Sequence, residues 1–281
     1  MKICVVGTGT MGNGIAQTFA QAGYDVLLKG RSEASLGKAH KAIEKSLSKL
    51  VEKGKMEAAE KDVINARIKD TMAYEDCKDA DLVIEVVAED MATKNEIFKT
   101  LDAICKPEAI LATNTSSLSI TEIAAATSRP EKVIGMHFFN PVPMMKLVEV
   151  IKGQLTSQEV HDKVMAIAAE VGKTPVSVNE APGFVVNRIL IPMVNEGIGI
   201  YADGVATKEE IDEAMKLGAN HPMGPLALGD LIGLDVCLAI MEVLYNEFGD
   251  SKYRPHPLLR KMVRANLLGR KTGIGFYDYR K

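Results

Sequence analysis

The feature that most constrains the fold of this 281-residue chain is a glycine-rich turn close to its N-terminus. The letters G-T-G-T-M-G follow an apolar run of strand length, residues 2–6, and open a helical pattern over residues 11–22. In a G-x-G-x-x-G turn the first glycine permits the tight bend, the second lets the backbone approach a pyrophosphate, and the third allows close packing of helix on strand. The N–H groups at the helix N-terminus favour phosphate. We therefore predict a dinucleotide-binding turn formed by Gly7, Thr8, Gly9, Thr10, Met11 and Gly12.

Strand-like and helical patterns alternate through the first two-thirds of the chain. Further apolar runs of strand length cover residues 25–29, 81–87, 109–113, 132–136, 147–151 and 174–178. Helical patterns cover residues 32–53, 58–66, 93–105, 119–126 and 157–171. Alternating βα units form a mostly parallel sheet with helices on both faces. The sequence therefore predicts a Rossmann-type, doubly wound α/β domain over residues 1–182 that binds the dinucleotide.

The pattern changes after residue 182, where the strand signals fade. Residues 184–201 form a helical pattern that is apolar on nearly all sides, which is typical of a helix buried in a core or in a subunit interface. Further helical patterns cover residues 207–217, 226–248 and 257–268. We predict a smaller all-helical C-terminal domain over residues 183–281 that contacts the substrate and forms a homodimer. In the alternative, the protein is a monomer and the apolar helix packs only against other parts of its own chain.

The composition argues against several classes of protein. A formal net charge of −3 gives no general attraction to nucleic acid or to an anionic membrane. No apolar run reaches the roughly 18 residues that a membrane span needs. The four cysteines and five histidines show neither C-x-x-C nor H-E-x-x-H spacing, so we expect reduced, buried thiols and no metal site. We expect a cytoplasmic protein that binds neither nucleic acid nor membrane.

The end of the second predicted strand indicates which dinucleotide binds. NAD-specific proteins usually place an Asp or Glu there, because a carboxylate accepts hydrogen bonds from the ribose hydroxyls. Here the strand ends in Gly30, Arg31 and Ser32, and the next carboxylate is Glu33. Arg31 offers a guanidinium and Ser32 a hydroxyl to a 2′-phosphate. We therefore favour NADP(H) over NAD(H); in the alternative, Arg31 is only solvated and both cofactors serve.

Polar residues follow two later strands, at the edge of a parallel sheet where ligands bind. Ser116 follows the run 109–113, and His137 comes just after the run 132–136. Glu149 stands among apolar neighbours in the run 147–151, and a buried carboxylate needs a partner. Removal of a hydride from a secondary alcohol requires a base for the hydroxyl proton, and an imidazole backed by a carboxylate suits that task. Each residue alone also fits a structural role, but their joint placement favours catalysis.

Seven segments, in order along the chain, make this sequence resemble the L-3-hydroxyacyl-CoA dehydrogenases. They are the glycine turn, N-T-S-S at 114–117, H-F-F-N-P at 137–141, M-K-L-V-E-V at 145–150, P-G-F-V-V-N-R at 182–188, H-P-M-G-P at 221–225 and K-T-G-I-G-F-Y at 271–277. The resemblance spans nearly the whole chain, and the compact length is similar to that of stand-alone members rather than multifunctional β-oxidation proteins. It implies interconversion of (S)-3-hydroxyacyl-CoA and 3-ketoacyl-CoA in fatty acid or butanoate metabolism, with the four-carbon pair expected.

The resemblance also implies roles for individual residues. His137 would be the general base in oxidation and the general acid in reduction, with Glu149 as its partner. Ser116 would hydrogen-bond the 3-oxygen of the substrate, and Asn187 would orient the acyl group and its thioester carbonyl. The family's ribose-binding Asp falls at Gly30, and this departure puts NAD preference in doubt. The positions expected near the cofactor are Glu89, Lys94, Asn114, Asn140 and Lys271.

Lysines recur every four residues along the predicted helix 32–53 and therefore align on one face. Coenzyme A carries a 3′-phosphate and a pyrophosphate, which a basic helical face can bind. The resemblance places Lys49 and Lys53 against this part of the substrate. In the alternative reading these lysines are only solvated.

Two other functions stay open at this point. A β-hydroxyacid or sugar-acid dehydrogenase that ignores coenzyme A would act on free acids and would be indifferent to loss of Lys49 and Lys53. A non-catalytic dinucleotide-binding relative would be expected to lack part of the catalytic set. All four members of that set are present, namely Ser116, His137, Glu149 and Asn187.

Overall fold

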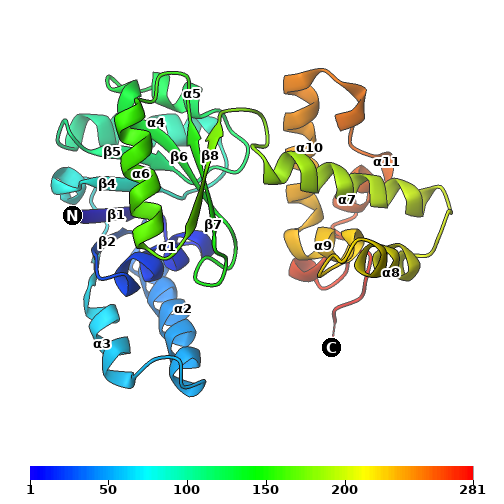
Figure 1. The fold of residues 1–281 in the computed structure, drawn as a ribbon, viewed down its shortest axis with the longest axis horizontal. Coiled ribbons are helices and arrows are strands. Elements are labelled where there is room, and N and C mark those ends of the chain that lie inside the picture. The colour runs from blue at the N-terminus through cyan, green and yellow to red at the C-terminus, as the bar shows by residue number, and fades with distance from the viewer. Residues whose placement is uncertain (281) are drawn as a thin grey trace. The chain divides into compact units, whose positions relative to one another are not determined.

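The computed structural model describes residues 1–280 and divides the chain into two compact units (Figure 1). The first unit is Met1–Glu180, and the second begins at Ala181. The division lies close to position 182, where the sequence pattern changes. Each unit has a hydrophobic core of its own.

The first unit is built on one eight-stranded sheet. Its strands are β1 (Lys2–Val6), β2 (Asp25–Lys29), β3 (Ile68–Thr71), β4 (Leu82–Glu85), β5 (Ile110–Thr113), β6 (Val133–Phe138), β7 (Leu147–Lys152) and β8 (Thr174–Asn179). They lie in the order β3-β2-β1-β4-β5-β6-β7-β8, and every pair is parallel except β6 with β7. The predicted doubly wound α/β topology is confirmed. The carboxyl ends of the parallel strands β1 to β6 share one edge, where such sheets bind ligands.

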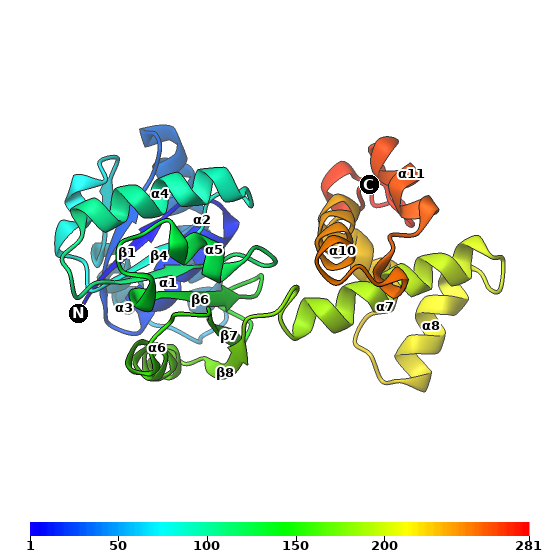
Figure 2. The same cartoon turned by 90° about the horizontal axis from the view of Figure 1, so that it is seen from above.

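Helices cover both faces of this sheet, as Figure 2 shows for α4 and α6. They are α1 (Thr10–Gln21), α2 (Glu33–Glu52), α3 (Ala58–Ala66), α4 (Met91–Ile104), α5 (Ile120–Ala125) and α6 (Gln158–Glu170). On one face, Phe19 of α1, Ile43 of α2 and Val164 of α6 join a single core cluster. On the other face, α4 buries Phe98 and Leu101. Because both faces are covered, β4 and β5 are buried along their whole length.

The second unit is all-helical. Its helices are α7 (Val186–Ala202), α8 (Lys208–Gly218), α9 (Pro225–Ile232), α10 (Leu234–Phe248) and α11 (Pro257–Arg264). Val194 of α7 and Leu244 of α10 lie at the centre of its core and are fully buried. The side chain of Ile189, also on α7, is 69% exposed, so this helix is not buried on all sides within its own unit.

Three details of the predicted elements are wrong. The single helix expected over residues 226–248 is two helices, because Gly233 between them has a φ of 104° that an α-helix cannot accommodate. Strand β3 was not expected, since only Ile68 and Thr71 of its four residues are buried and no apolar run marks it. Strand β6 extends to Phe138, so His137 lies within the strand rather than after it.

The described residues contain neither a membrane-spanning helix nor a metal cluster. Among residues 1–280 no helix is long and apolar enough to cross a membrane. The same part of the chain holds no group of three or more His, Cys, Asp or Glu side chains placed to bind a metal ion. All four cysteines are buried and free.

Candidate active site

The glycine turn between β1 and α1 makes contacts that only glycine allows. A Cβ on Gly12 would lie 2.0 Å from the carbonyl oxygen of Gly7. Gly7 itself has a φ of 127°, and a Cβ there would meet the carbonyl oxygen of Val86 at 2.8 Å. A Cβ on Gly9, in contrast, would meet nothing within 4 Å. The turn is therefore packed on its inner side and open beside Gly9, as a pyrophosphate-binding turn requires.

A cavity of about 760 Å³ lies against this turn. It is lined by the turn itself, by the residues that follow β2, by Tyr74, and by residues 86–88 after β4. Strand β1 lies between β2 and β4, so the cavity occupies the point where the strand order reverses and where doubly wound sheets bind nucleotides. Its volume is within the range of small-molecule and cofactor sites.

The cavity wall is basic. Lys29, Arg31 and Lys38 line it, and no Asp or Glu is among its described lining residues. The Nζ atom of Lys29 lies 3.7 Å from the centre of the Tyr74 ring, which holds this ammonium group at the end of β2. The electrostatics of the cavity therefore favour an anionic ligand.

The turn after β2 is tightly packed around Gly30 at its tip. A Cβ on Gly30 would lie 2.6 Å from Cγ of Leu36, which is buried in the first turns of α2. Ser32 is the N-cap of α2, and its side chain accepts a hydrogen bond from the backbone N–H of Ser35 at 3.2 Å. Arg31 is exposed between these two fixed residues and forms no ion pair with residues 1–280.

His137 and Glu149 face each other across the antiparallel strands β6 and β7, whose register pairs these two residues. His137 Nδ1 lies 2.7 Å from Glu149 Oε2, and the two side chains are 7% and 1% exposed. The ring of Phe139 lies beside the imidazole, with 4.4 Å between the ring centres. A buried carboxylate on Nδ1 fixes the tautomer in which Nε2 is the basic nitrogen. The structure thus brings the predicted pair together.

Asn114 and Asn140 follow β5 and β6 at the same edge. The side-chain oxygen of Asn114 accepts a hydrogen bond from the backbone N–H of Phe138 at 2.8 Å. This bond ties the end of β5 to the end of β6. Asn140 is exposed.

A buried charged cluster connects β4 to the segment that carries Ser116. The carboxylate of Glu85 is fully buried and lies 2.8 and 2.9 Å from Nζ of Lys94, which is 1% exposed. The hydroxyl of Thr113 donates to the same carboxylate at 2.7 Å. Glu89 lies 3.6 Å from Lys94 Nζ and accepts a hydrogen bond from the backbone N–H of Ser116 at 2.7 Å. Two residues expected near the cofactor and one expected at the substrate therefore belong to one network.

Sequence reasoning missed Glu85. Its signal was present, because a carboxylate stands inside the apolar run 81–87 just as Glu149 stands inside the run 147–151. A carboxylate buried in a central strand must be paired, and Lys94 on α4 is the partner.

The remaining predicted residues belong to α2 and to the second unit. Asn187, in the first turn of α7, is 9% exposed, and Lys271 forms an ion pair with Asp235 at the start of α10. Both belong to the second unit, whereas Ser116, His137 and Glu149 belong to the first. Two further predicted residues are exposed at the C-terminal end of α2, namely Lys49 and Lys53.

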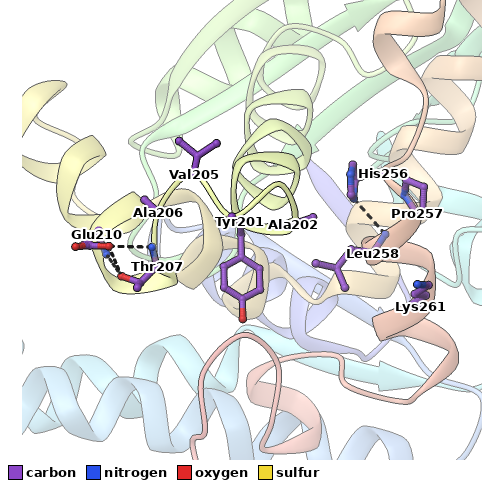
Figure 3. A pocket seen from close by; sticks show the side chains of 11 residues that line it. Tyr201, Ala202, Val205, Ala206, Thr207, Glu210, His256, Pro257, Leu258 and Lys261 are labelled. Carbon is purple, nitrogen blue, oxygen red and sulfur yellow. Dashed lines mark hydrogen bonds between the residues drawn. The ribbon is translucent and has the colours of Figure 1, made fainter.

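The helical unit has a cavity of its own, of about 790 Å³ (Figure 3). Thr207 and Glu210 in its wall bond each other in the capping box of α8. The imidazole of His256 accepts a hydrogen bond from the backbone N–H of Leu258 at 3.1 Å and caps α11. These polar groups cap the N-termini of α8 and α11, and none of the predicted site residues lines this cavity.

Comparison with known families agrees with the geometry of the first unit. The family model described as "3-hydroxyacyl-CoA dehydrogenase, NAD binding domain" matches residues 2–181. The model described as "3-hydroxyacyl-CoA dehydrogenase, C-terminal domain" matches residues 183–279. Together the two models cover both units of the structure.

Individual relatives are similar over the whole chain. A 3-hydroxybutyryl-CoA dehydrogenase from Clostridioides difficile is 67% identical over all of both chains. A probable 3-hydroxybutyryl-CoA dehydrogenase from Bacillus subtilis is 59% identical over 99% of this chain and 97% of its own. Among solved structures, the (S)-3-hydroxybutyryl-CoA dehydrogenase from Ralstonia eutropha superposes with a TM-score of 0.97 at 52% identity, covering 100% of this chain and 99% of its own.

Proposed function

Because the chain belongs to the 3-hydroxyacyl-CoA dehydrogenase family, we propose that it interconverts (S)-3-hydroxybutyryl-CoA and acetoacetyl-CoA. The observation that carries this proposal is the buried pair of His137 and Glu149, with Nδ1 and Oε2 2.7 Å apart at the ligand-binding edge of the sheet. The open space beside Gly9 and the basic cavity wall fit the phosphates of a nicotinamide dinucleotide. When bound, the nicotinamide ring accepts or donates the hydride.

His137 moves the proton in this reaction. In oxidation its Nε2 takes the proton of the substrate's 3-hydroxyl as the hydride leaves C3, and in reduction it returns that proton to the 3-oxygen. Glu149 stabilises the imidazolium formed in between, because the two side chains share a desolvated hydrogen bond. Ser116 donates a hydrogen bond to the 3-oxygen, and Asn187 of the helical unit orients the thioester carbonyl.

NADP(H) is the preferred cofactor in this proposal. Arg31 and Lys38 offer cationic groups to a 2′-phosphate, and no acidic residue among the described lining residues repels it. A carboxylate at the tip of β2, which would bind an unphosphorylated ribose, would require Leu36 to move, because a Cβ on Gly30 would lie 2.6 Å from its Cγ. Glu89, Lys94, Asn114 and Asn140 complete the proposed cofactor site in the first unit, and a cofactor role for Lys271 stays a prediction from the family resemblance.

The coenzyme A part of the substrate is proposed to bind at the end of α2. Lys49 and Lys53 are exposed there on one face of the helix, and both are free to meet phosphate groups of a ligand. Replacing both with Gln should raise the KM for acetoacetyl-CoA and leave the KM for the cofactor unchanged. Equal activity on the free acid would instead favour a dehydrogenase that ignores coenzyme A.

We also propose that the chain forms a homodimer through its helical unit. Ile189, Val205 and Leu217 are 69%, 73% and 77% exposed in the single chain, and covering such apolar side chains would stabilise an association. Light scattering should give twice the chain mass. A monomer at micromolar concentration would contradict this part of the proposal.

The deciding experiment is a steady-state assay of the purified chain with acetoacetyl-CoA and either NADPH or NADH. We expect reduction to the (S)-alcohol, with a higher kcat/KM for NADPH. Absence of turnover with both cofactors would refute the proposed function. A clear preference for NADH would refute the cofactor assignment alone.

A further inference from the structure

The carboxylate of Glu89 accepts hydrogen bonds from the backbone and side chains of the segment that carries Ser116. Its Oε1 accepts from the Thr115 hydroxyl at 2.5 Å and from the backbone N–H of Ser116 at 2.7 Å. Longer bonds come from the Ser116 hydroxyl at 3.1 Å and from the N–H and hydroxyl of Ser117 at 3.2 and 3.4 Å. One oxygen of Glu89 therefore determines the path of three consecutive residues after β5.

These bonds are unequal in a way that suits catalysis. A carboxylate oxygen has two lone pairs, so the two shortest bonds are the strong ones, and they fix Thr115 and the backbone of Ser116. The Ser116 hydroxyl makes one of the longer bonds, at 3.1 Å. Its proton can turn toward a ligand oxygen while the backbone stays in place. The backbone of Ser116 is thus rigid and its hydroxyl adjustable.

Glu89 is itself held by a buried charge. Lys94 Nζ lies 3.6 Å from Glu89 Oε2, and Glu85 fixes that ammonium group with two bonds of 2.8 and 2.9 Å. Glu85 also accepts from the Thr113 hydroxyl and from the backbone N–H of Val87, both at 2.7 Å. The fully buried carboxylate of Glu85 is therefore saturated, and it anchors Lys94 at a constant distance from β4 and β5.

We propose that Glu89, held by the Glu85–Lys94 pair, is a positioning residue that sets the Ser116 hydroxyl for the 3-oxygen of the substrate. This inference rests on the proposed function and adds to it a role for Glu89 beyond cofactor contact. Without the carboxylate, the segment 115–117 loses its common hydrogen-bond acceptor. The backbone of Ser116 is then no longer fixed, and its hydroxyl is no longer held within reach of the substrate.

A double-mutant cycle tests this role, because two residues that act through one another give non-additive effects. The variants are Glu89→Gln, Ser116→Ala and the double variant, measured with acetoacetyl-CoA at saturating cofactor. We expect Glu89→Gln to lower kcat about tenfold or more, since charge-assisted hydrogen bonds are lost. In the Ser116→Ala background the same change should lower kcat by no more than about twofold.

The matched control is Glu96→Gln on α4, the helix that begins just after Glu89. The side chain of Glu96 is 74% exposed and forms an ion pair with Lys99 at the surface, so this variant should keep the wild-type kcat. The cofactor Kd, from a fluorescence titration, separates positioning from cofactor contact. A pure cofactor role predicts a raised Kd and independent losses that multiply in the double variant, and that result would overturn the proposal.

A second variant keeps the test decisive if Glu89→Gln does not fold. Thr115→Val nearly preserves the volume of the side chain and removes the 2.5 Å bond to Glu89, together with the bonds that the Thr115 hydroxyl accepts from the backbone N–H groups of Ser117 and Leu118 at 3.3 and 2.9 Å. It should lower kcat in the wild type and have little effect once Ser116 is Ala. A loss that is equal in both backgrounds would contradict the positioning role. In either outcome the wild type reduces acetoacetyl-CoA, whereas an inactive wild type would refute the proposed function itself.

Discussion

Replacement of Glu149 by Gln should impair hydride transfer without preventing folding. The amide has the shape of the carboxylate but lacks its charge, and it faces an imidazole 2.7 Å away in a site where the two native side chains are 7% and 1% exposed. A hydrogen bond to a charged group contributes about 1.5–3 kcal/mol. At about 1.4 kcal/mol per factor of ten, its loss lowers kcat roughly 10- to 150-fold.

The orientation of the new amide decides whether the loss is larger. If the Gln NH₂ faces Nδ1, the imidazole must accept a hydrogen bond there, which opposes the doubly protonated imidazolium that donates the proton in the reduction. In the triad of serine proteases the equivalent Asp-to-Asn change lowers kcat by about 10⁴. We therefore expect a decrease in kcat between about tenfold and about 10⁴-fold, with the KM for acetoacetyl-CoA nearly unchanged.

The assay is steady-state reduction of acetoacetyl-CoA at saturating cofactor, followed by the loss of reduced nicotinamide absorbance. Glu159→Gln is the matched control, because Glu159 is exposed in the first turn of α6 on the same unit. A folded Glu149→Gln variant with kcat within twofold of the wild type would refute the reasoning.

Three further predictions concern the cofactor site and the stability of the first unit. Arg31→Ala should weaken NADPH binding about tenfold or more and NADH binding little, as titrations of both cofactors would show; equal losses would make Arg31 structural. Gly30→Asp should lower the free energy of unfolding by about 1–3 kcal/mol, because its Cβ would lie 2.6 Å from Leu36 Cγ; an unchanged Tm would contradict this clash. The hydrogen bond from Lys106 lowers the pKa of Asp81 below its unfolded value of about 3.9, so this carboxylate stabilises the fold above that pH and less as the pH falls through the lowered pKa. Asp81→Asn should therefore reduce the free energy of unfolding at pH 7. In acid-unfolding curves the difference from the wild type should shrink below about pH 4, and a difference that grows there would contradict the assignment.

The sequence was most informative where local pattern and topology agree. The glycine turn predicted its own close contacts, because a Cβ at Gly12 has no space in any such turn. The alternation of strand and helix patterns was enough to predict the doubly wound sheet. The pairing of His137 with Glu149 also followed from chemistry, since a buried carboxylate requires a partner.

Other features depend on geometry that local pattern does not contain. The apolar periodicity continues across Gly233, and only its positive φ shows that the helix ends there. Strand β3 is half-exposed, so its pairing with β2 defines it more than its composition does. The hydrogen bonds from Ser116 to Glu89 join residues 27 positions apart, and only the folded chain shows that one carboxylate organises that segment.

The most direct test of the central claim is replacement of His137 by Ala. The site predicts that turnover of acetoacetyl-CoA falls by a factor of about 10² or more, because no other group takes over the proton transfer, while the cofactor Kd stays near the wild-type value. The measurement combines kcat with a fluorescence titration of the cofactor on the same preparation. Near-normal kcat in a folded variant that binds cofactor would contradict the account of this site.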